Sequence, residues 1–496
     1  MLSKDKICAV VAAKDSKTMT RQLAQALLCT RTAELRLDWL ADDLEIGRFL
    51  RQLAAKRIRA NLLATCRRRK ASGQYRGTVA HQLLHLAEAL RAGCTWYDLE
   101  IESASKCPSE LLDVLLGEGR QITSAHFFRS MPTSLTPTVR LLRAKRPSAI
   151  KIAAQCDSLA AGLRLLRLTR GRRDVIAVPM GEVAMPLRIL AHRHGSALAY
   201  APVENATAPG QVSLSEMTSL YRADRITRRT RIYGVIGDPI AHSLSPQLHN
   251  AGFQASKMDA VYLPFLVYDL RDFLAAIAPL GIAGFSVTLP HKQSILRHLD
   301  DCDPLAASIG AVNTVVVRGG AKLYGYNTDY VGVLHALGQR ISLHGSRVLI
   351  LGAGGAARAV AFALAQAGAT VCVLARRKEK SAALARAIGG ETTDRRRLAH
   401  EFFDAIVNAT PVGMHPHVHR SPLEARELNC RLLFDTIYRP ERTRLMQLAA
   451  RRGIEVVSGI EMFIAQGRAQ WEIWTGERAP QAPMRRAVIR ALRTSK

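Results

Sequence analysis

The chain has 496 residues and a formal net charge of +29, and 48% of its residues are apolar. This apolar fraction is too high for a disordered protein, and a chain of this length usually folds as two or more domains. No uncharged apolar run reaches the roughly 18 residues of a membrane-spanning helix, so no transmembrane span is expected. The nine cysteines are scattered without a C-x-x-C pair, which argues against a disulfide framework or zinc ribbon and indicates buried thiols in a reducing compartment.

The strong positive charge has two interpretations. A sequence pI near 10.4 is typical of nucleic-acid-binding proteins. The basic clusters, at 67–70, 376–378 and 395–397, are however short, far apart and free of interleaved aromatic residues. We therefore favour an arginine-rich solvated surface, with a few charges serving anionic small molecules, and expect neither a nucleic-acid nor a membrane partner.

Residues 1–222 repeat one pattern, in which a short apolar run precedes a segment with apolar residues at helical spacing. There are eight such runs, at 7–13, 33–39, 60–66, 96–102, 121–127, 148–154, 175–181 and 196–202. Eight strand–helix units in about 220 residues predict a closed (β/α)8 barrel, the TIM barrel. Such barrels carry their chemistry where the strands end, and the polar residues in or just after the runs are Arg36, Arg67, Glu100, His126 and Lys151.

The pattern breaks at 223–230, a charged segment without an apolar stripe, which we interpret as a linker. A second α/β series starts at residue 231. Within it, residues 347–377 are predicted to form a strand, a glycine turn, a helix and a second strand, and residues 352–357 match G-x-G-x-x-A. Small residues there let the backbone approach a pyrophosphate, whose charge the helix N-terminus would meet. This half is therefore predicted to contain a Rossmann dinucleotide-binding lobe.

The end of the second Rossmann strand predicts the type of cofactor. It carries Arg376, Arg377 and Lys378, and no carboxylate appears before Glu379. Guanidinium groups at this point suit a 2′-phosphate, so we expect NADP(H). A surface basic cluster is the alternative, and the glycine turn just upstream argues against it.

Two polar sets in the second half suggest a carbonyl-reducing site. Lys292 and Asp329 each lie at the end of an apolar run, and such a pair can hold an ammonium beside a carbonyl and pass a proton to the alkoxide that a hydride creates. Ser243 and Ser245 offer two hydroxyls to a carboxylate. The alternatives are a surface ion pair for the first set and a helix cap before Pro246 for the second.

Residues 231–496 resemble the shikimate dehydrogenases throughout. The resemblance rests on the ordered motifs GDPIAHSLSP (237–246), GFSVTLPHK (284–292), GAVNTVV (310–316), YGYNTDYVG (324–332), NATPVGM (408–414), FDTIYRP (434–440) and SGIEMFIAQG (458–467). It implies a two-lobed α/β dehydrogenase, with a shikimate-binding lobe at 231–335, an NADP-binding Rossmann lobe at 336–460 and C-terminal helices at 461–496 that return to the substrate lobe.

The same resemblance assigns roles to residues, with Lys292 and Asp329 as the catalytic pair. It implies substrate contacts by Ser243, Ser245, Thr288, Asn313, Tyr438 and Gln466. It implies cofactor contacts by Gly352, Ala353, Gly354, Gly355, Ala356, Arg376, Arg377, Lys378, Thr410 and Gly459. One departure is Ala375, where the family usually has an asparagine beside the adenosine ribose.

Residues 1–222 resemble the type I 3-dehydroquinate dehydratases. The matching segments are AELRLDW (33–39), ATCR (64–67), TSAHF (123–127), IKIA (150–153), MGEVAMPLR (180–188) and ATAPGQ (206–211). The resemblance implies that Lys151 forms a Schiff base with the ring ketone and that His126 is the general acid and base. A desolvated lysine loses its charge readily, as a carbonyl nucleophile must. The implied substrate contacts are Glu34, Arg36, Arg67, Arg188, Thr207 and Gln211, with Thr207 replacing the usual serine.

The barrel departs from its family at one position. The family has a glutamate that orients the histidine where this chain has Ala71, so Glu100 or Asp98 is expected to orient His126 instead, or the dehydratase to be slow. His126 could also be purely structural. Glu34 and Arg36 share one face of a strand and could simply pair with each other.

The two resemblances describe consecutive reactions. Dehydration of 3-dehydroquinate gives 3-dehydroshikimate, which a shikimate dehydrogenase reduces to shikimate, so the chain resembles the bifunctional 3-dehydroquinate dehydratase/shikimate dehydrogenases. No metal is implied, the histidines of 414–419 included. The alternatives are a quinate-preferring dehydrogenase with an inactive barrel, a barrel retained as a scaffold, and a basic nucleic-acid-binding protein. Nothing before the first strand resembles a plastid transit peptide, so we expect a cytoplasmic enzyme. Its oligomeric state stays open.

Overall fold

The computed structural model describes residues 5–107, 112, 117, 119–204 and 210–494. The chain divides into two compact units, Met1–Thr230 with Arg271–Pro279, and Arg231–Leu270 with Leu280–Lys496. The segment 223–230, expected as a linker, lies within the first unit and buries the side chains of Ala223 and Ile226. All nine cysteines are free thiols.

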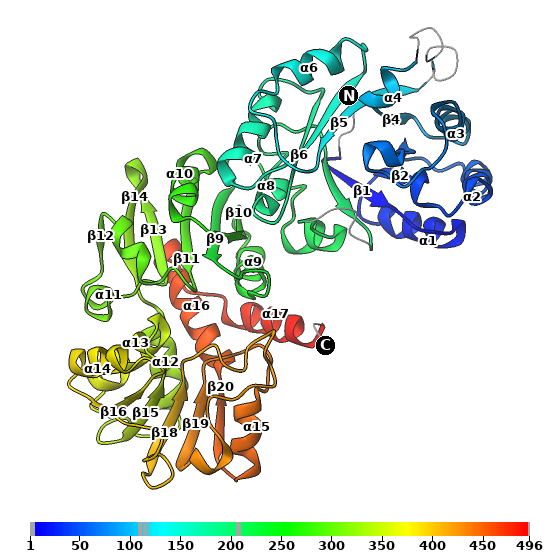
Figure 1. The fold of residues 1–496 in the computed structure, drawn as a ribbon. Helices are drawn as coiled ribbons and strands as arrows, with labels where there is room; N and C mark the ends of the chain where they lie inside the picture. Colours follow the sequence, from blue (N-terminus) through cyan, green and yellow to red (C-terminus); the bar gives the residue numbers. More distant parts are fainter. Residues whose placement is uncertain (1–4, 108–111, 113–116, 118, 205–209, 495–496) are drawn as a thin grey trace. The chain divides into compact units, whose positions relative to one another are not determined.

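An eight-stranded parallel sheet forms the first unit, with helices around it (Figure 1). Its strand order is β7-β6-β5-β4-β3-β2-β1-β8, so the last strand pairs with the first. Between β7 and β8 the described residues form no ladder. A backbone bond from Ala197 N to Val175 O (3.0 Å) and a bond from Ala177 N to Ser196 Oγ (3.1 Å) connect β7 to the residues just before β8. The predicted TIM barrel is confirmed, nearly closed, with strands β1 Ile7–Val11, β2 Thr32–Arg36, β3 Asn61–Thr65, β4 Trp96–Glu100, β5 Arg120–Phe127, β6 Ala149–Gln155, β7 Val175–Met180 and β8 Ala199–Pro202.

Short polar side chains start the barrel helices. Asp15, Asp42, Thr78 and Ser158 each accept the backbone N–H three residues further on, which satisfies a donor that the helix leaves open. Each helix therefore begins at a defined residue after its strand. The helices are α1 Ser16–Leu27, α2 Asp43–Lys56, α3 Val79–Arg91, α4 Ile101–Ala104, α6 Thr136–Arg143, α7 Leu159–Leu166 and α8 Met185–Ile189.

The barrel interior changes from apolar to polar along the strands. An inner cluster contains Leu63, Trp96, Ile122 and Ala149, one from each of four neighbouring strands. Strand residues two positions apart point to the same face. The next inward positions are therefore residues 65, 98, 124 and 151. They are polar on every one of these strands: Thr65, Asp98, Ser124 and Lys151.

The second unit has two lobes. The first lobe is a six-stranded sheet of order β10-β9-β11-β13-β14-β12, in which β13 runs antiparallel to its neighbours. Its strands are β9 Arg231–Gly237, β10 Ala260–Leu266, β11 Ile282–Val287, β12 Asp301–Cys302, β13 Thr314–Arg318 and β14 Lys322–Tyr326. Helices α9 Ser245–Ala255, α10 Leu270–Leu280 and α11 Pro304–Ile309 lie between these strands in the sequence, and residues 271–279 of α10 group with the first unit.

The second lobe is a parallel sheet of order β17-β16-β15-β18-β19-β20, which is the strand order of a Rossmann fold and confirms that prediction. Its strands are β15 Arg347–Leu351, β16 Thr370–Leu374, β17 Glu391–Thr392, β18 Phe403–Asn408, β19 Cys430–Asp435 and β20 Glu455–Ser458. Its helices are α13 Gly355–Gln366, α14 Lys378–Ala387 and α15 Arg444–Arg451.

Two helices lie between the lobes, α12 Asp329–Gly338 and α16 Gly459–Thr475, and they pack against each other (Figure 1). The last helix, α17 Gln481–Thr494, packs on α9 of the first lobe. The chain thus returns to the lobe in which the second unit began.

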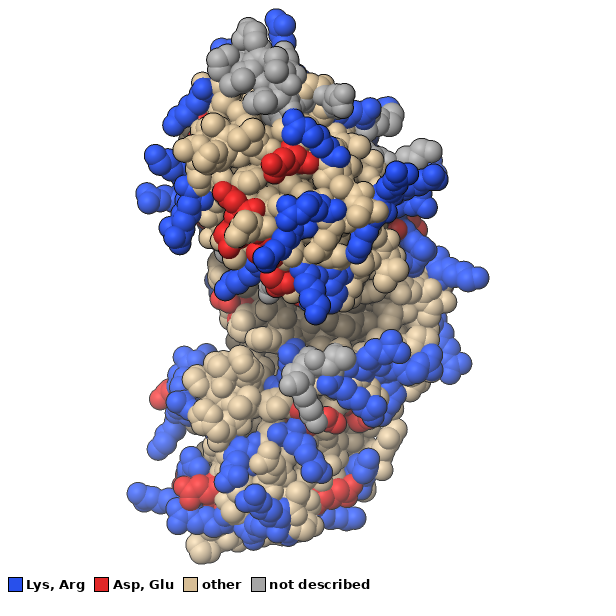
Figure 2. All heavy atoms as spheres, turned by 90° about the vertical axis from the view of Figure 1, so that its right-hand side faces the viewer, with Lys and Arg blue, Asp and Glu red and all other residues tan. Residues whose placement is uncertain are grey.

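The positive charge is spread over the surface. Lysine and arginine side chains are dispersed over the face in Figure 2, with acidic side chains among them. In the part of the chain that the structure describes, no helix is long and apolar enough to cross a membrane.

Gly234 offers a test of packing in strand β9, which lies between β10 and β11. A Cβ there would lie 2.5 Å from Leu263 O and 2.5 Å from the Phe265 ring, so Gly234→Ala should destabilise the second unit by about 1–3 kcal/mol. The control is Gly338→Ala, which adds a methyl in open space on helix α12 and should stabilise by about 0.5–1 kcal/mol. Thermal unfolding of both variants checks this, and equal effects would contradict the packing argument.

Candidate active sites

The barrel holds one lysine between two carboxylates. Lys151, on β6, is 5% exposed, and its Nζ lies 2.9 Å from Asp98 Oδ2 and 3.2 Å from Glu34 Oε1. The ammonium also lies over the ring of Tyr200, 4.1 Å from its centre. The lysine is thus removed from solvent, and two carboxylates share its buried surroundings.

The two carboxylates are held by the neighbouring strands. Asp98 accepts from Ser124 Oγ at 2.5 Å and from Arg67 Nη2 at 3.4 Å. Burial would raise the pKa of Asp98, but Lys151 and Arg67 outweigh burial and hold the pKa below its usual range. Glu34 accepts from Thr65 Oγ1 at 2.9 Å. The partners of the lysine, Asp98, Glu34 and Tyr200, therefore come from three different strands, β4, β2 and β8.

His126 lies two residues after Ser124 on β5 and so faces the same way. Burial, together with Arg67 and Lys151, lowers the pKa of His126 well below its ordinary value of 6.5. The imidazole is therefore neutral at neutral pH and able to take a proton. Its ring stacks on Phe128, with centres 5.7 Å apart.

The structure corrects the expectation that Glu100 or Asp98 orients His126. Glu100 accepts from Gln82 Nε2 (2.9 and 3.0 Å) and Ser103 Oγ (2.8 Å). Asp98 is engaged by the lysine, Arg67 and Ser124. Among the residues described, neither carboxylate forms a hydrogen bond with the imidazole. The charge of Asp98 still acts on the imidazole and raises its pKa, but burial and the charges of Arg67 and Lys151 outweigh this effect, so the pKa of His126 stays lowered.

Arg188 Nη1, Arg67 Nε and Tyr200 OH are buried donors that have no hydrogen-bond partner in the described part of the chain. Arg188 is 5% exposed, and burial lowers its pKa to about 10. A buried guanidinium nitrogen without an acceptor is costly, and a ligand carboxylate would satisfy it.

The remaining predicted barrel residues differ in their surroundings. Arg36 pairs with Asp38 through two bonds of 2.9 and 2.8 Å, rather than with Glu34. Gln211 is half-buried, and Gly210 beside it packs on the end of β7, where a Cβ would lie 2.3 Å from Gly181 O. Thr207 lies outside the described residues.

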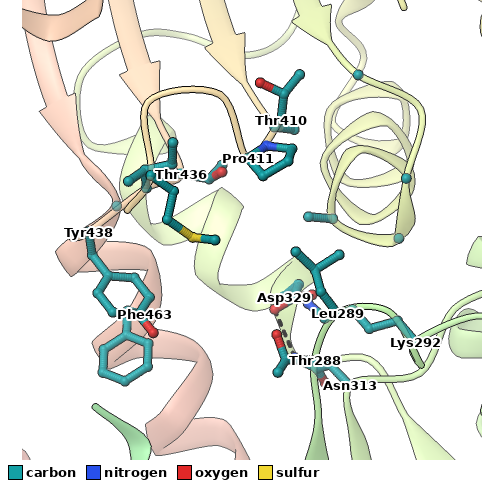
Figure 3. A pocket seen from close by; sticks show the side chains of 18 of the residues that line it. Thr288, Leu289, Lys292, Asn313, Asp329, Thr410, Pro411, Thr436, Tyr438 and Phe463 are labelled. Atoms are coloured by element: carbon teal, nitrogen blue, oxygen red, sulfur yellow. Dashed lines mark hydrogen bonds and ion pairs between the residues drawn. The ribbon is translucent and has the colours of Figure 1, made fainter. Parts of the chain in front are cut away.

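The second unit contains a cavity of about 570 Å³, lined by residues of both lobes. On one wall, Lys292 Nζ lies 2.5 Å from Asp329 Oδ2, and Asn313 Nδ2 donates to Asp329 Oδ1 at 2.8 Å (Figure 3). Lys292 and Asp329 are largely buried, so this is not the exposed ion pair of the alternative interpretation. Thr288 and Gln466 line the same cavity, and Gln466 Oε1 accepts from Asn313 at 3.4 Å.

The two serines and a tyrosine form another part of the wall. Ser243 and Ser245 line the cavity at the start of α9, and Ser243 Oγ accepts from Ser245 N at 3.3 Å. Helix α9 starts at Ser245 with Leu244 at its N-cap position and no side-chain cap, so the capping interpretation is wrong, and the Ser243 hydroxyl interacts with Tyr438. Burial raises the pKa of Tyr438, which lies near Ser243 and packs on Phe463 with ring centres 4.5 Å apart (Figure 3).

The glycine turn lines the other end of the cavity. Gly352 has φ +112°, and Gly354 has open space where a Cβ would be. Helix α13 starts here, and no side chain caps its first N–H groups. Gly355 lies so close to Lys292 that a Cβ would be 3.0 Å from the lysine Cβ, which brings the turn next to the lysine–aspartate pair.

Most predicted cofactor residues line this end: Gly352, Ala353, Gly354, Gly355, Ala356, Arg376, Arg377, Thr410 and Gly459. Lys378 is the exception. It is the first residue of α14 and does not line the cavity, whereas Lys380 does. Successive side chains of the helix that begins at residue 378 point in different directions. The sequence of basic residues alone therefore does not show which of them lines the cavity.

Sequence reasoning missed several residues of both sites. In the barrel these are Thr65, Ser124 and Tyr200, and in the cavity His242, His415, Met462, Phe463 and Gln470. The period of two along β3 and β5 could have indicated Thr65 and Ser124. No group of three or more potential metal ligands is found within the described ranges.

Family models match the chain in the same two halves. The model for type I 3-dehydroquinase matches residues 7–228. The shikimate dehydrogenase substrate-binding domain matches residues 235–315, the shikimate/quinate 5-dehydrogenase model matches 335–435, and the C-terminal domain of shikimate 5′-dehydrogenase matches 459–489.

Individual relatives agree with these models. A shikimate dehydrogenase (NADP+) of Bacillus anthracis is 44% identical over 53% of this chain and 99% of its own length. A crystal structure of a shikimate dehydrogenase in complex with NADP+ superposes with a TM-score of 0.51 at 36% identity, covering 54% of this chain and 97% of that chain. The chloroplastic bifunctional 3-dehydroquinate dehydratase/shikimate dehydrogenase of Arabidopsis thaliana is 34% identical over 96% of this chain and 83% of its own length. With both halves matched in one relative, this chain belongs to the family of bifunctional 3-dehydroquinate dehydratase/shikimate dehydrogenases.

Proposed function

We propose that the chain converts 3-dehydroquinate to 3-dehydroshikimate in its barrel and reduces that product to shikimate with NADPH in its second unit. One observation carries the proposal: each unit holds a largely buried lysine against a carboxylate, Lys151 with Asp98 and Lys292 with Asp329. The first pair suits imine formation and the second suits proton transfer to a carbonyl.

In the barrel, Lys151 Nζ attacks the ring ketone and the carbonyl oxygen leaves as water, which gives an imine. Before attack Nζ must lose a proton, and Glu34 Oε1 lies 3.2 Å away to receive it. His126, neutral at neutral pH, then takes the C2 proton, and the electron pair delocalises into the imine as an enamine. The proton passes from the imidazole to the departing C1 hydroxyl, and hydrolysis of the imine frees Lys151. Arg188, with its buried unpartnered nitrogen, is our candidate for the substrate carboxylate.

The residues of the second unit fit NADP(H). The open side of Gly354 and the uncapped start of α13 leave backbone N–H groups for a pyrophosphate, and Arg376 and Arg377 offer guanidinium groups for a 2′-phosphate. When bound, the cofactor supplies the hydride. Lys292 Nζ donates the proton that turns the substrate's C3 oxygen into a hydroxyl, and Asp329 holds the ammonium for that step. Ser243 and Ser245 are proposed for the substrate carboxylate, and Thr288, Asn313, Tyr438 and Gln466 for its remaining polar groups.

The alternative of a dehydrogenase with an inactive barrel is not favoured. Lys151, His126 and Arg188 are all present, and Arg188 Nη1, Arg67 Nε and Tyr200 OH have no acceptor among the residues described. We propose a cytoplasmic location, supported by the nine free cysteines.

A coupled assay tests both reactions. With 3-dehydroquinate and NADPH, the wild type should oxidise NADPH and form shikimate. Lys151→Met should lose this by a factor of about 10² or more but keep its rate on 3-dehydroshikimate, because only the imine step is removed. Lys292→Met should fail on both substrates by a factor of about 10²–10⁴. The reverse pattern of losses would refute the division of labour.

Covalent trapping tests the barrel nucleophile. Borohydride added with 3-dehydroquinate should reduce the imine to a stable amine and add the substrate's mass to the peptide that contains Lys151. Mass spectrometry locates the adduct, and the Lys151→Met variant is the control. An unmodified Lys151 peptide in a catalytically active preparation would rule out the Schiff base.

The pH profile of the dehydratase tests the state of His126. Its folded pKa is lowered below 6.5, so the neutral base persists as the pH falls through 6.5 and is lost only below it. kcat/KM for 3-dehydroquinate should therefore stay flat from neutral pH to 6.5 and decline further down. His81→Ala, on the exposed face of α3, is the control and should leave the profile unchanged. A wild-type acidic limb centred above 6.5 would contradict the assignment.

A further inference from the structure

Gln470 is a buried glutamine of α16 that none of the assignments above uses. It is 1% exposed and borders the cavity of the second unit. Its Nε2 donates to Asn313 O (3.2 Å) and Thr314 Oγ1 (3.1 Å). Its Oε1 accepts from Ser286 Oγ at 2.9 Å and lies 3.3 Å from His249 Nε2. The amide thus uses both its donors and its acceptor on protein groups.

The orientation of this amide is determined by its partners. The carbonyl of Asn313 can only accept, so the amide nitrogen of Gln470 must face it. On the opposite side, burial lowers the pKa of His249 to about 3, so its ring is neutral and can donate from Nε2 to Gln470 Oε1. The Asn313 carbonyl alone fixes the orientation, and a His249 ring that donates from Nε2 is compatible with it.

A directed chain of donors leads from Gln470 to the reacting groups. Thr314 Oγ1 accepts from Gln470 and donates to Asn313 Oδ1 at 2.7 Å. Thr328 N donates to the same oxygen at 2.8 Å. With its oxygen engaged twice, Asn313 turns Nδ2 toward Asp329 Oδ1, 2.8 Å away. The other oxygen of this aspartate holds the lysine ammonium of the site.

We propose that Gln470 is a positioning residue for the reduction: it holds Asn313 and Thr314 so that the Asn313 amide keeps the Asp329 carboxylate turned toward Lys292. The proposal rests on the proposed function of the second unit, since it concerns the rate of that reaction. It goes further by naming a residue at the edge of the cavity that sets the geometry of the catalytic pair.

Trp474 provides a matched control for a purely structural role. It lies four residues further along the same helix, and its Nε1 donates to Val315 O at 3.0 Å, on the same strand as Thr314. It ties α16 to β13 just as Gln470 does, but it does not line the cavity and contacts neither Asn313 nor Asp329 through a hydrogen bond. A merely structural tie would therefore give the same kinetic result at both positions.

The experiment compares Gln470→Met with Trp474→Phe in the full chain. Gln470→Met keeps the side-chain volume and removes the hydrogen bonds. It should lower kcat/KM for 3-dehydroshikimate about tenfold and leave the KM for NADPH unchanged, because misplaced polar groups act on the substrate and the proton donor. Trp474→Phe should lower the thermal midpoint and keep kcat/KM within about twofold of wild type. Equal kinetic losses in both variants would overturn the positioning role.

Thr314→Val gives a second route that does not depend on the folding of Gln470→Met. It breaks the same series of hydrogen bonds at the next residue, so kcat/KM should also fall in Thr314→Val. The double variant, Gln470→Met with Thr314→Val, should lose no more than the stronger single variant. Independent, additive losses, or a Gln470→Met enzyme within about twofold of wild type, refute the proposal. A wild type that does not reduce 3-dehydroshikimate at all refutes instead the proposed function on which it rests.

Discussion

Each unit of this protein depends on an ammonium group held against a carboxylate away from solvent. Lys151 lies 2.9 Å from Asp98, and Lys292 lies 2.5 Å from Asp329. Removing two charges from water is costly, and such a pair is tolerated only when further hydrogen bonds satisfy its remaining atoms. Ser124 and Arg67 serve Asp98 in this way, and Asn313 serves Asp329. Many of the polar side chains in both sites therefore serve to hydrogen-bond the carboxylates of these two pairs.

Parallel sheets explain where the pairs lie. In the barrel, the inward positions carry apolar residues first and polar residues two positions later, on four neighbouring strands. Because the strands are parallel, these polar residues meet in one layer, and Lys151 finds partners from strands distant in sequence. In the second unit the glycine turn follows β15 in the same manner, and the tight approach of Gly355 to Lys292 joins the cofactor end to the catalytic pair.

The failed expectations share a physical cause. Glu100 and Asp98 were expected to orient His126 in place of the missing glutamate, but both carboxylates are engaged by other donors. Lys378 was chosen from a run of basic residues, yet a helix starts there and Lys380 reaches the cavity instead. In each case the outcome depended on side-chain direction, which adjacency in sequence does not specify.

The sequence by itself determined the order of strands and helices, the glycine turn and the lysines of both sites, because hydrophobic periodicity and local motifs act over short stretches of chain. It also sufficed to identify both families, since their motifs occur in order along the chain. Only the tertiary structure decided that Asp98 and Glu34 flank Lys151, that Tyr200 covers it, and that Gln470 stands behind Asn313. These contacts join residues 49 to 157 positions apart, and they follow from sheet register and helix packing rather than from any local pattern.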